Sequence, residues 1–228
     1  MTPEFTSFPK MARLSREILI TEKIDGTNAT IQIIGNHNGY YDADPMVVAK
    51  GEAYNAEMDD MIPAVMYAGS RTRWITPQAD NHGFATWVAA NAQELFDLGF
   101  GTHRGEWWGS GIQRGYGLTK GEKRLSLFNI SRWALHGTEP QRIPMADPRI
   151  EKFQDVLPPC VGLVPLLYKG PFDTKFVNST LTLLVANGSV AAPGFMDPEG
   201  IVLFHIAGNV GFKKTIHNDH EPKGKPNQ

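Results

Sequence analysis

The segment 21–28, Thr-Glu-Lys-Ile-Asp-Gly-Thr-Asn, constrains the fold more than any other part of the chain. An apolar run (Ile18–Ile20) precedes it, and an alternating run (Ala29–Ile33) follows it. Asp-Gly between two strand-like segments is a strong turn signal, so the pattern predicts a β-hairpin. Lys23 would then stand at a strand end, beside a backbone that can approach a phosphate closely. A plain turn is the commoner meaning of so short a motif, and a reactive lysine is the alternative.

Composition limits the classes of protein to which the chain can belong. Its 228 residues are 41% hydrophobic and 20% charged, which supports a sizeable core and excludes wholesale disorder. The formal net charge of −2 means that any nucleic-acid binding must come from a local groove. Cys160 is the single cysteine, which excludes an internal disulfide framework and fits a reducing compartment. We find neither an apolar run of about 18 residues nor a signal peptide, and expect a soluble cytoplasmic protein without a membrane partner.

Strand-like segments dominate the chain, and they do not alternate regularly with helices. This pattern favours an α+β fold over a doubly wound sheet. Helices are predicted over 83–98, ending at Gly99, and over 173–187, with a third over 147–157. We expect one domain over 1–216 and a polar tail over 217–228. The predicted strands are 18–24, 28–34, 46–53, 102–108, 124–133, 161–168, 200–206 and 210–216.

A glycine-rich segment, 104–115, follows a predicted strand. Its spacing fits neither a Walker loop nor a dinucleotide fingerprint. Glu106, next to Gly105, is unusual in so apolar a strand, and its carboxylate could accept hydrogen bonds from a sugar's hydroxyls. The simpler interpretation is a flexible loop after a strand, with Trp107 and Trp108 in the core.

Two further segments carry candidates for nucleotide binding. Phe128 breaks the alternation of its strand and falls on the face of Ser126, where it is either a surface aromatic or a stacking platform for a base. Arg71 and Arg73 are equally explicable as surface residues or as phosphate contacts.

Two segments near the C-terminus carry candidate charges. Glu199 and Gly200 begin a strongly apolar strand, which indicates either a turn or a carboxylate close to a metal-bound phosphate. Lys213 and Lys214 end the next strand, as solvated residues or as cations for a triphosphate.

The order of these motifs is more specific than any one of them. From Lys23 to Lys214, over about four fifths of the chain, they run Lys-x-Asp-Gly, an arginine segment, Gly-Glu, an aromatic strand, Glu-Gly-Ile-Val and a lysine strand. This order resembles the covalent nucleotidyltransferase superfamily of ATP-dependent ligases and capping enzymes. The chain looks most like the RNA ligases of the T-even phage nick-sealing type. Asn28 favours that branch, because DNA ligases usually carry an arginine at this place.

The resemblance implies an adenylyltransferase domain of antiparallel sheets flanked by helices. It makes Lys23 the nucleophile that forms a lysyl-AMP with ATP, and it assigns Glu199 to Mg²⁺ or Mn²⁺ and to catalysis. Lys213 would also be catalytic, through the triphosphate. The AMP would pass to a 5′-phosphate end and then be expelled by a 3′-hydroxyl. The implied nucleotide-binding residues are Glu22, Lys23, Asn28, Arg71, Glu106, Phe128, Lys213 and Lys214.

The chain departs from the family pattern in two ways. Lys213 and Lys214 are adjacent, so strand alternation turns them to opposite faces, and we favour Lys213. The sequence given ends fourteen residues after Lys214, so we expect no OB domain and consider a partner protein that supplies the missing clamp.

The expected partners are RNA ends, nicked or single-stranded, and possibly DNA. The alternatives are a DNA ligase, a guanylyltransferase, or a module that binds nucleic-acid ends without completing ligation.

Overall fold

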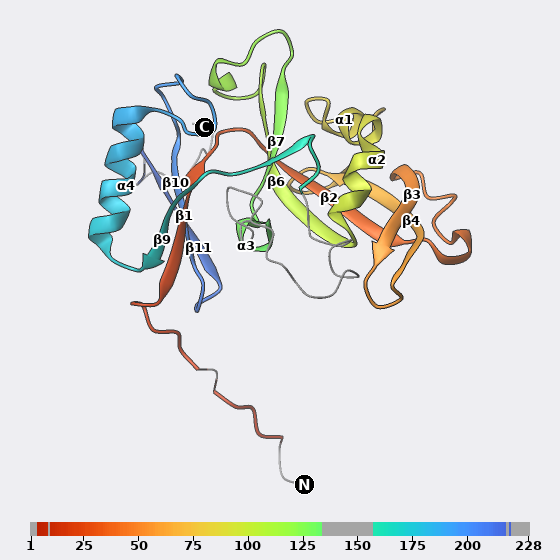
Figure 1. Ribbon diagram of the computed structural model, residues 1–228, viewed down its shortest axis with the longest axis horizontal. Coiled ribbons are helices and arrows are strands. Elements are labelled where there is room, and N and C mark those ends of the chain that lie inside the picture. The colour runs from red at the N-terminus through yellow and green to blue at the C-terminus, as the bar shows by residue number, and fades with distance from the viewer. Residues whose placement is uncertain (1–3, 9, 134–156, 218, 220–228) are drawn as a thin grey trace, which may run out of the picture. The chain divides into compact units, whose positions relative to one another are not determined.

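The chain folds into two compact units, each with its own sheet. The computed structural model describes residues 4–8, 10–133, 157–217 and 219 (Figure 1). The first unit comprises residues 1–23 and 165–228, and the second comprises residues 24–164. The chain therefore passes between them twice, and the first passage comes directly after Lys23.

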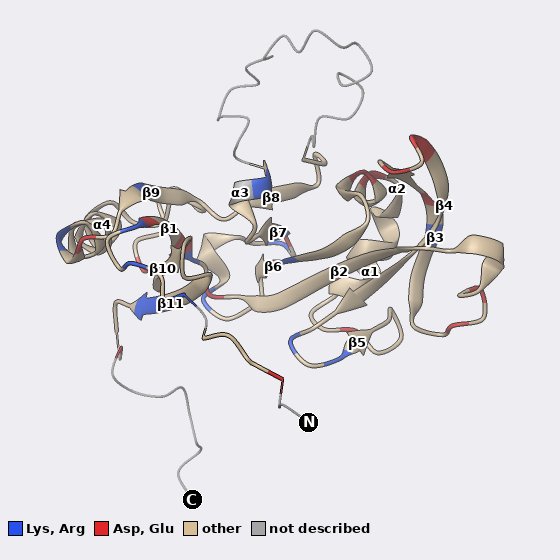
Figure 2. Ribbon diagram, turned by 90° about the horizontal axis from the view of Figure 1, so that it is seen from below, with Lys and Arg blue, Asp and Glu red and all other residues tan. Residues whose placement is uncertain are grey.

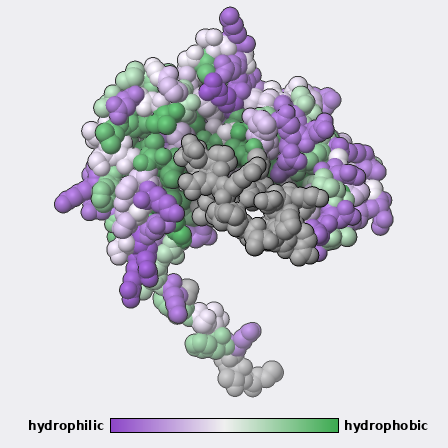
Figure 3. Space-filling view, viewed as in Figure 1, coloured by the Kyte–Doolittle hydropathy of each residue, from purple (hydrophilic) through white to green (hydrophobic). Residues whose placement is uncertain are grey.

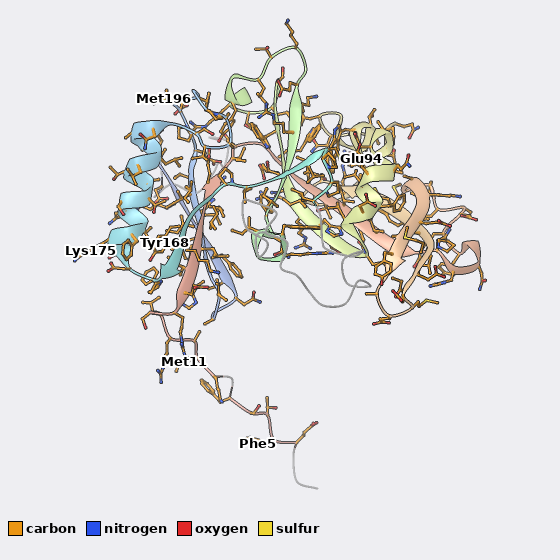
Figure 4. The ribbon with its side chains drawn as sticks, in the orientation of Figure 1. Phe5, Met11, Glu94, Tyr168, Lys175 and Met196 are labelled. Carbon is orange, nitrogen blue, oxygen red and sulfur yellow. The ribbon has the colours of Figure 1, made fainter. Side chains whose placement is uncertain are left out.

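The first unit is a four-stranded antiparallel sheet in the order β11-β10-β1-β9. A helix, α4 (Thr174–Asn187), packs on one face of this sheet (Figure 1). Asp173 caps the helix by accepting a hydrogen bond from the backbone N of Lys175 at 2.8 Å. The ring of Tyr168 on β9 stacks on the ring of Phe176 on α4, with 4.9 Å between the ring centroids. Tyr168 and Lys175 are labelled in Figure 4. The strands are β1 (Glu17–Lys23), β9 (Leu166–Pro171), β10 (Gly200–His205) and β11 (Val210–Thr215), and the core contains Ile18, Ile20, Leu184, Ile201 and Leu203.

The second unit is a larger sheet in the order β3-β4-β2-β6-β7-β8, with β5 paired to β4. Its pairs are antiparallel except for β7 with β8. Helical segments cover one face and share a core with Ile31, Met66 and Trp107. The strands are β2 (Thr27–Gly35), β3 (Val47–Asn55), β4 (Asp60–Gly69), β5 (Trp74–Ile75), β6 (Gly101–Gly109), β7 (Lys123–Leu127) and β8 (Val161–Leu163). The helical segments are η1 (His37–Gly39), α1 (Phe84–Ala90), α2 (Ala92–Leu95), η2 (Phe96–Leu98), η3 (Gly115–Gly117) and α3 (Ile130–Trp133).

The predicted hairpin at Asp25-Gly26 is wrong. β1 pairs with β9 and β10, whereas β2 pairs with β4 and β6, so the turn links two sheets instead of closing one. Gly26 explains why the turn lies against β6. A Cβ on Gly26 would lie 2.5 Å from the carbonyl oxygen of Trp107, so only glycine lets the turn lie so close to β6.

The α+β class with mainly antiparallel sheets is confirmed, and the structure adds two strands that the sequence did not predict. β4 contains Pro63, which discourages a strand assignment. Pro63 lies just beyond Ala64, the last residue of β4 that pairs with β2. Its carbonyl oxygen still accepts a hydrogen bond, from the backbone N of Asn36 at 2.7 Å. The other missed strand, β5, has only two residues.

Several other predicted elements have different boundaries in the structure. The predicted strand 124–133 ends at Leu127 and is followed by α3, and the strand 161–168 is two strands, β8 and β9. The predicted helix 83–98 is a chain of three short helical segments, α1, α2 and η2. The expected helix 147–157 and the polar tail fall almost entirely outside the described residues.

The N-terminal segment before β1 is exposed and mixes hydrophobic with hydrophilic residues (Figure 3). Phe5 and Met11 project from it and are 89% and 84% exposed (Figure 4). Among the helices of the described chain, none is both long enough and apolar enough to cross a membrane.

Candidate active site

Lys23 is the last residue of β1, and its amine donates a hydrogen bond to the carboxylate of Glu199. The Lys23 side chain is 20% exposed and that of Glu199 only 3%. Gly200 places the pair, because it lies opposite Lys23 in the β1–β10 register and adopts a φ of +154°. A Cβ at Gly200 would collide with the backbone of Lys214, so the Glu-Gly sequence fits a tight contact between β10 and β11.

The register of the first sheet separates the two adjacent lysines of β11. Lys213 lies opposite Val202, which lies opposite Thr21, so alternation places Lys213 on the same face of the sheet as Lys23. Lys214 lies opposite Ile201 and falls on the other face. There it forms an ion pair with Asp219 at 3.9 Å.

Glu22 is engaged by its own unit. Its carboxylate is buried and accepts hydrogen bonds from the Ser189 hydroxyl at 2.5 Å and from the backbone N of Val190 and Ala191 at 2.8 and 2.9 Å. These donors lie in the segment that connects α4 to Glu199. Glu22 therefore fixes the segment that brings Glu199 to Lys23.

Glu106 holds the turn that follows Lys23. Its two carboxylate oxygens accept bonds from the backbone N of Gly26 at 3.0 Å and from the Asn28 side chain at 3.3 Å. Asn28 in turn accepts from Nε of Arg71 at 2.9 Å. Thr27, between them, accepts from the Asn81 side chain at 3.1 Å. Three of the predicted nucleotide-binding residues thus form one hydrogen-bonded chain within the second unit.

Arg114 and Tyr116 contact Asp25 in the turn, and neither was predicted as a site residue from the sequence. Nε of Arg114 donates to Asp25 at 3.1 Å, and the Tyr116 hydroxyl accepts from the backbone N of Asp25 at 2.9 Å. Tyr116 is 2% exposed and has a φ of +51°. Arg114 lies in the glycine-rich segment 104–115, and Tyr116 directly follows that segment. An arginine and a tyrosine among so many glycines were the available signal.

Phe128 follows β7 and is 43% exposed. Its backbone N donates to the carbonyl oxygen of Arg104 at 2.9 Å, which continues the β6–β7 pairing beyond Leu127. Because the pairing continues to Phe128, the regular alternation of side chains in a strand places the Phe128 ring on the same face of the sheet as Ser126 and Glu106. The predicted site residues form two groups, with Lys23, Glu199 and Lys213 in the first unit and Glu106, Asn28, Arg71 and Phe128 in the second.

The described residues contain no cluster of three or more metal-ligating side chains. Glu199 is nevertheless an oxygen ligand of the kind that Mg²⁺ and Mn²⁺ prefer, and these ions usually complete their coordination with substrate phosphates and water. The donor set therefore fits a metal that is held by one carboxylate and a nucleotide.

Comparison with known proteins shows which fold and which family the chain resembles. Several solved structures of RNA ligase from Naegleria gruberi resemble the chain. A variant with ATP and Mn has a TM-score of 0.50 and 15% identity, over 95% of this chain and 58% of that one. The ligase with PPi has the same score and identity, over 94% of this chain and 57% of that one.

These likenesses show the fold, and the chain spans a little over half the length of the solved ligases. No curated protein matches it. A family model described as RNA ligase matches residues 16–214. The chain belongs to the RNA ligase family.

Proposed function

We propose that the chain is the adenylyltransferase part of an ATP-dependent RNA ligase that resembles the nick-sealing type and joins the 3′-hydroxyl and 5′-phosphate ends of nicked or single-stranded RNA. The observation that carries the proposal is the contact between Lys23 and the buried Glu199, at the end of β1 in a member of the RNA ligase family. An amine held by a buried carboxylate, next to a turn, suits a nucleophile that must be aimed at phosphorus.

In the first step the Lys23 amine attacks the α-phosphorus of ATP. The N–P bond forms, the bond from the α-phosphorus to the bridging oxygen breaks, and pyrophosphate leaves. The amine must give up a proton to react, and Glu199 is in contact with it and can accept that proton. Lys213, on the same face of the sheet, would stabilise charge that develops on the phosphates.

The second unit would recognise the nucleoside. Glu106 would accept bonds from the ribose hydroxyls, Phe128 would stack on adenine, and Asn28 and Arg71 would contact ribose or phosphate. A bound Mg²⁺ or Mn²⁺ would polarise the phosphoryl oxygens. Naegleria structures that were solved with Mn and ATP or AMP support this choice of nucleotide and metal.

The last two steps transfer AMP and seal the ends. A 5′-phosphate oxygen attacks the α-phosphorus of the lysyl-AMP, which breaks the N–P bond and restores the amine. A 3′-hydroxyl then attacks the 5′-phosphorus of the adenylylated strand and expels AMP.

Labelling with α-³²P ATP and Mg²⁺ tests the first step. We expect acid-labile label on the wild-type protein and none on Lys23→Ala, and we expect EDTA to abolish it. Lys169→Ala is the matched control, because Lys169 lies on the same sheet and is half exposed. An unlabelled wild type, or an equally labelled Lys23→Ala variant, would refute the mechanism.

Nicked and single-stranded substrates with 5′-phosphate ends separate the later steps. Sealing of RNA ends supports the full ligase, and accumulation of the adenylylated strand supports an enzyme that stops before sealing. Sealing of DNA ends alone would refute the assignment to RNA.

A further inference from the structure

Trp74 stands out among the five tryptophans, all of which lie in the described part of the chain. Trp107, Trp108 and Trp133 are at most 6% exposed, and Trp87 packs against Phe84 and Trp107 in the core. Trp74 is 40% exposed, although tryptophan is a large apolar side chain that normally avoids water.

The Trp74 ring is held in a fixed place on the second sheet. A Cβ on Gly69 would lie 3.1 Å from two ring carbons of Trp74 and 3.3 Å from Cβ of Thr30, so the ring lies over Gly69 beside Thr30. The ring of Tyr67 packs against the ring of Trp74, with 5.5 Å between their centroids. The Tyr67 hydroxyl donates a hydrogen bond of 2.9 Å to the carboxylate of Asp44. The ring is therefore a rigid surface.

This position is on the same face as the proposed nucleotide-binding residues. Thr30 and Asn28 alternate with Ala29 and Ile31, which belong to the core, so they lie on the opposite face from the core. Thr30 is two residues from Asn28 along β2, a distance of about 7 Å, which is close to the spacing of successive nucleotides in an extended strand.

Trp74 follows a segment that carries two arginines. Arg71 and Arg73 precede it in an exposed loop, which appears as two blue segments next to β5 in Figure 2. Arg71 is directed to Asn28, and Arg73 donates to the carbonyl oxygen of Ala79 at 3.4 Å. Within the described residues neither arginine is paired with a carboxylate, although the protein as a whole is slightly acidic.

We propose that Trp74 is a stacking site for a base of the single RNA strand to be joined, and that Arg73 binds a phosphate of that strand. An exposed aromatic face with a neighbouring guanidinium is how proteins hold single strands, because every base offers a face for stacking and the backbone offers charge. The inference rests on the proposed ligase function, which brings a strand to this site. Phe128 is left for the adenine of ATP.

Binding of a short 5′-phosphorylated single-stranded oligoribonucleotide, without ATP, tests the proposal. We expect the RNA to quench tryptophan fluorescence in the wild type and to lose that effect in Trp74→Ala. The dissociation constant of Trp74→Ala should rise about 5- to 150-fold, and Trp74→Phe should recover most of the affinity. Phe176→Ala is the matched control, because Phe176 is an aromatic residue of similar exposure, 46%, on α4 in the first unit.

The salt dependence of binding tests Arg73 separately. Arg73→Gln should lower the slope of log affinity against log salt by about 0.7, the value for one phosphate contact on a single strand. Lys50→Gln removes a charge that is paired with Asp42 at 2.9 Å and should leave the slope unchanged.

Labelling of Lys23 by ATP without RNA distinguishes failure of this inference from failure of the ligase proposal. Trp74→Ala should be labelled at the wild-type rate. Equal RNA affinity in Trp74→Ala and wild type would overturn the inference, as would slower labelling in Trp74→Ala with normal RNA binding. Normal RNA binding that depends on Trp74, in a wild type that takes no label, would refute the ligase proposal and leave the stacking site standing.

Discussion

Asp25 is held by two contacts, from Nε of Arg114 to its carboxylate and from its backbone N to the Tyr116 hydroxyl. The turn that contains Asp25 begins one residue after Lys23, so we expect these contacts to orient the amine. Arg114→Ala should slow adenylylation of Lys23 about 10- to 100-fold at saturating ATP, because small displacements of a reacting group are costly. Arg114→Lys should recover only part of the rate, since lysine lacks the planar guanidinium fork.

Single-turnover labelling measures this effect. Tyr116→Phe should act in the same direction, because it removes the acceptor of the Asp25 amide. An Arg114→Ala variant that is labelled at the wild-type rate would show that the turn keeps its position without the arginine.

Glu22 was predicted to bind the nucleotide, whereas its carboxylate bonds with the 189–191 segment. A glutamine cannot accept from all three donors, so Glu22→Gln should lower the free energy of unfolding by about 1–3 kcal/mol. Urea denaturation measures the change. Glu17→Gln, on the exposed end of the same strand, should stay within about 0.5 kcal/mol. An unchanged stability together with a raised KM for ATP would instead support a nucleotide contact.

At the scale of elements, α1 depends on Asp80. The carboxylate accepts bonds from the backbone N of Asn81, Ala85 and Thr86 at 2.6, 2.8 and 3.0 Å, and from the Thr86 hydroxyl at 2.7 Å. Burial raises the pKa of Asp80, but the bonds from Thr86, Ala85 and Asn81 lower it by more, so the pKa is below the ordinary value of 3.8.

A lowered pKa in the folded state makes this contribution depend on pH. The charged form stabilises the fold above pH 3.8, and the contribution is lost as the pH falls through the lower, folded value. Asp80→Ala should cost about 1–2 kcal/mol at pH 7, because Asp80 accepts bonds from backbone N–H groups in the first turn of α1, and the cost should fall as the medium becomes acidic. Urea unfolding of both proteins from pH 7 to about pH 3 checks this. A difference that grows toward low pH would contradict it.

The strand β11 gives a matched pair of variants. Lys213 shares the face of Lys23 and Lys214 does not. Lys213→Ala should therefore slow adenylylation about 100-fold, the usual effect of losing one group that stabilises phosphoryl charge, and Lys214→Ala should change it little. Equal losses in the two variants, measured by labelling, would mean that β11 is not a regular strand when ATP is bound.

Across the whole molecule, the sequence predicted the local features better than their partners. The order of motifs predicted the RNA ligase family, which is confirmed, and the Asp25-Gly26 pair predicted a turn between two strands. The prediction that the strands on either side of this turn pair with each other was wrong. Gly26 lies against Trp107 of β6, a residue distant in the sequence, and the turn residues alone do not indicate that contact. Arg114 and Tyr116 contact Asp25 across 89 and 91 residues, and no short-range pattern encodes such contacts.

The two units have separate cores, and the last prediction concerns how they unfold. No residue of the described core of one unit belongs to that of the other, and the chain connects the units twice. Leu184 is buried in the core of the first unit, whereas Cys160 packs against that of the second. Leu184→Ala should lower the stability of the first unit by about 2–5 kcal/mol and leave the second unit intact.

Cys160 reports on the second unit, because thiolates and not thiols react with disulfide reagents. Burial, together with a hydrogen bond to Glu94 of α2 (labelled in Figure 4), raises the pKa of Cys160 to about 12. The native thiol should therefore react slowly at pH 8 and quickly once the second unit opens. In dilute urea, Leu95→Ala, in α2, should speed labelling of Cys160, and Leu184→Ala should not. If both variants speed labelling equally, the two units unfold as one.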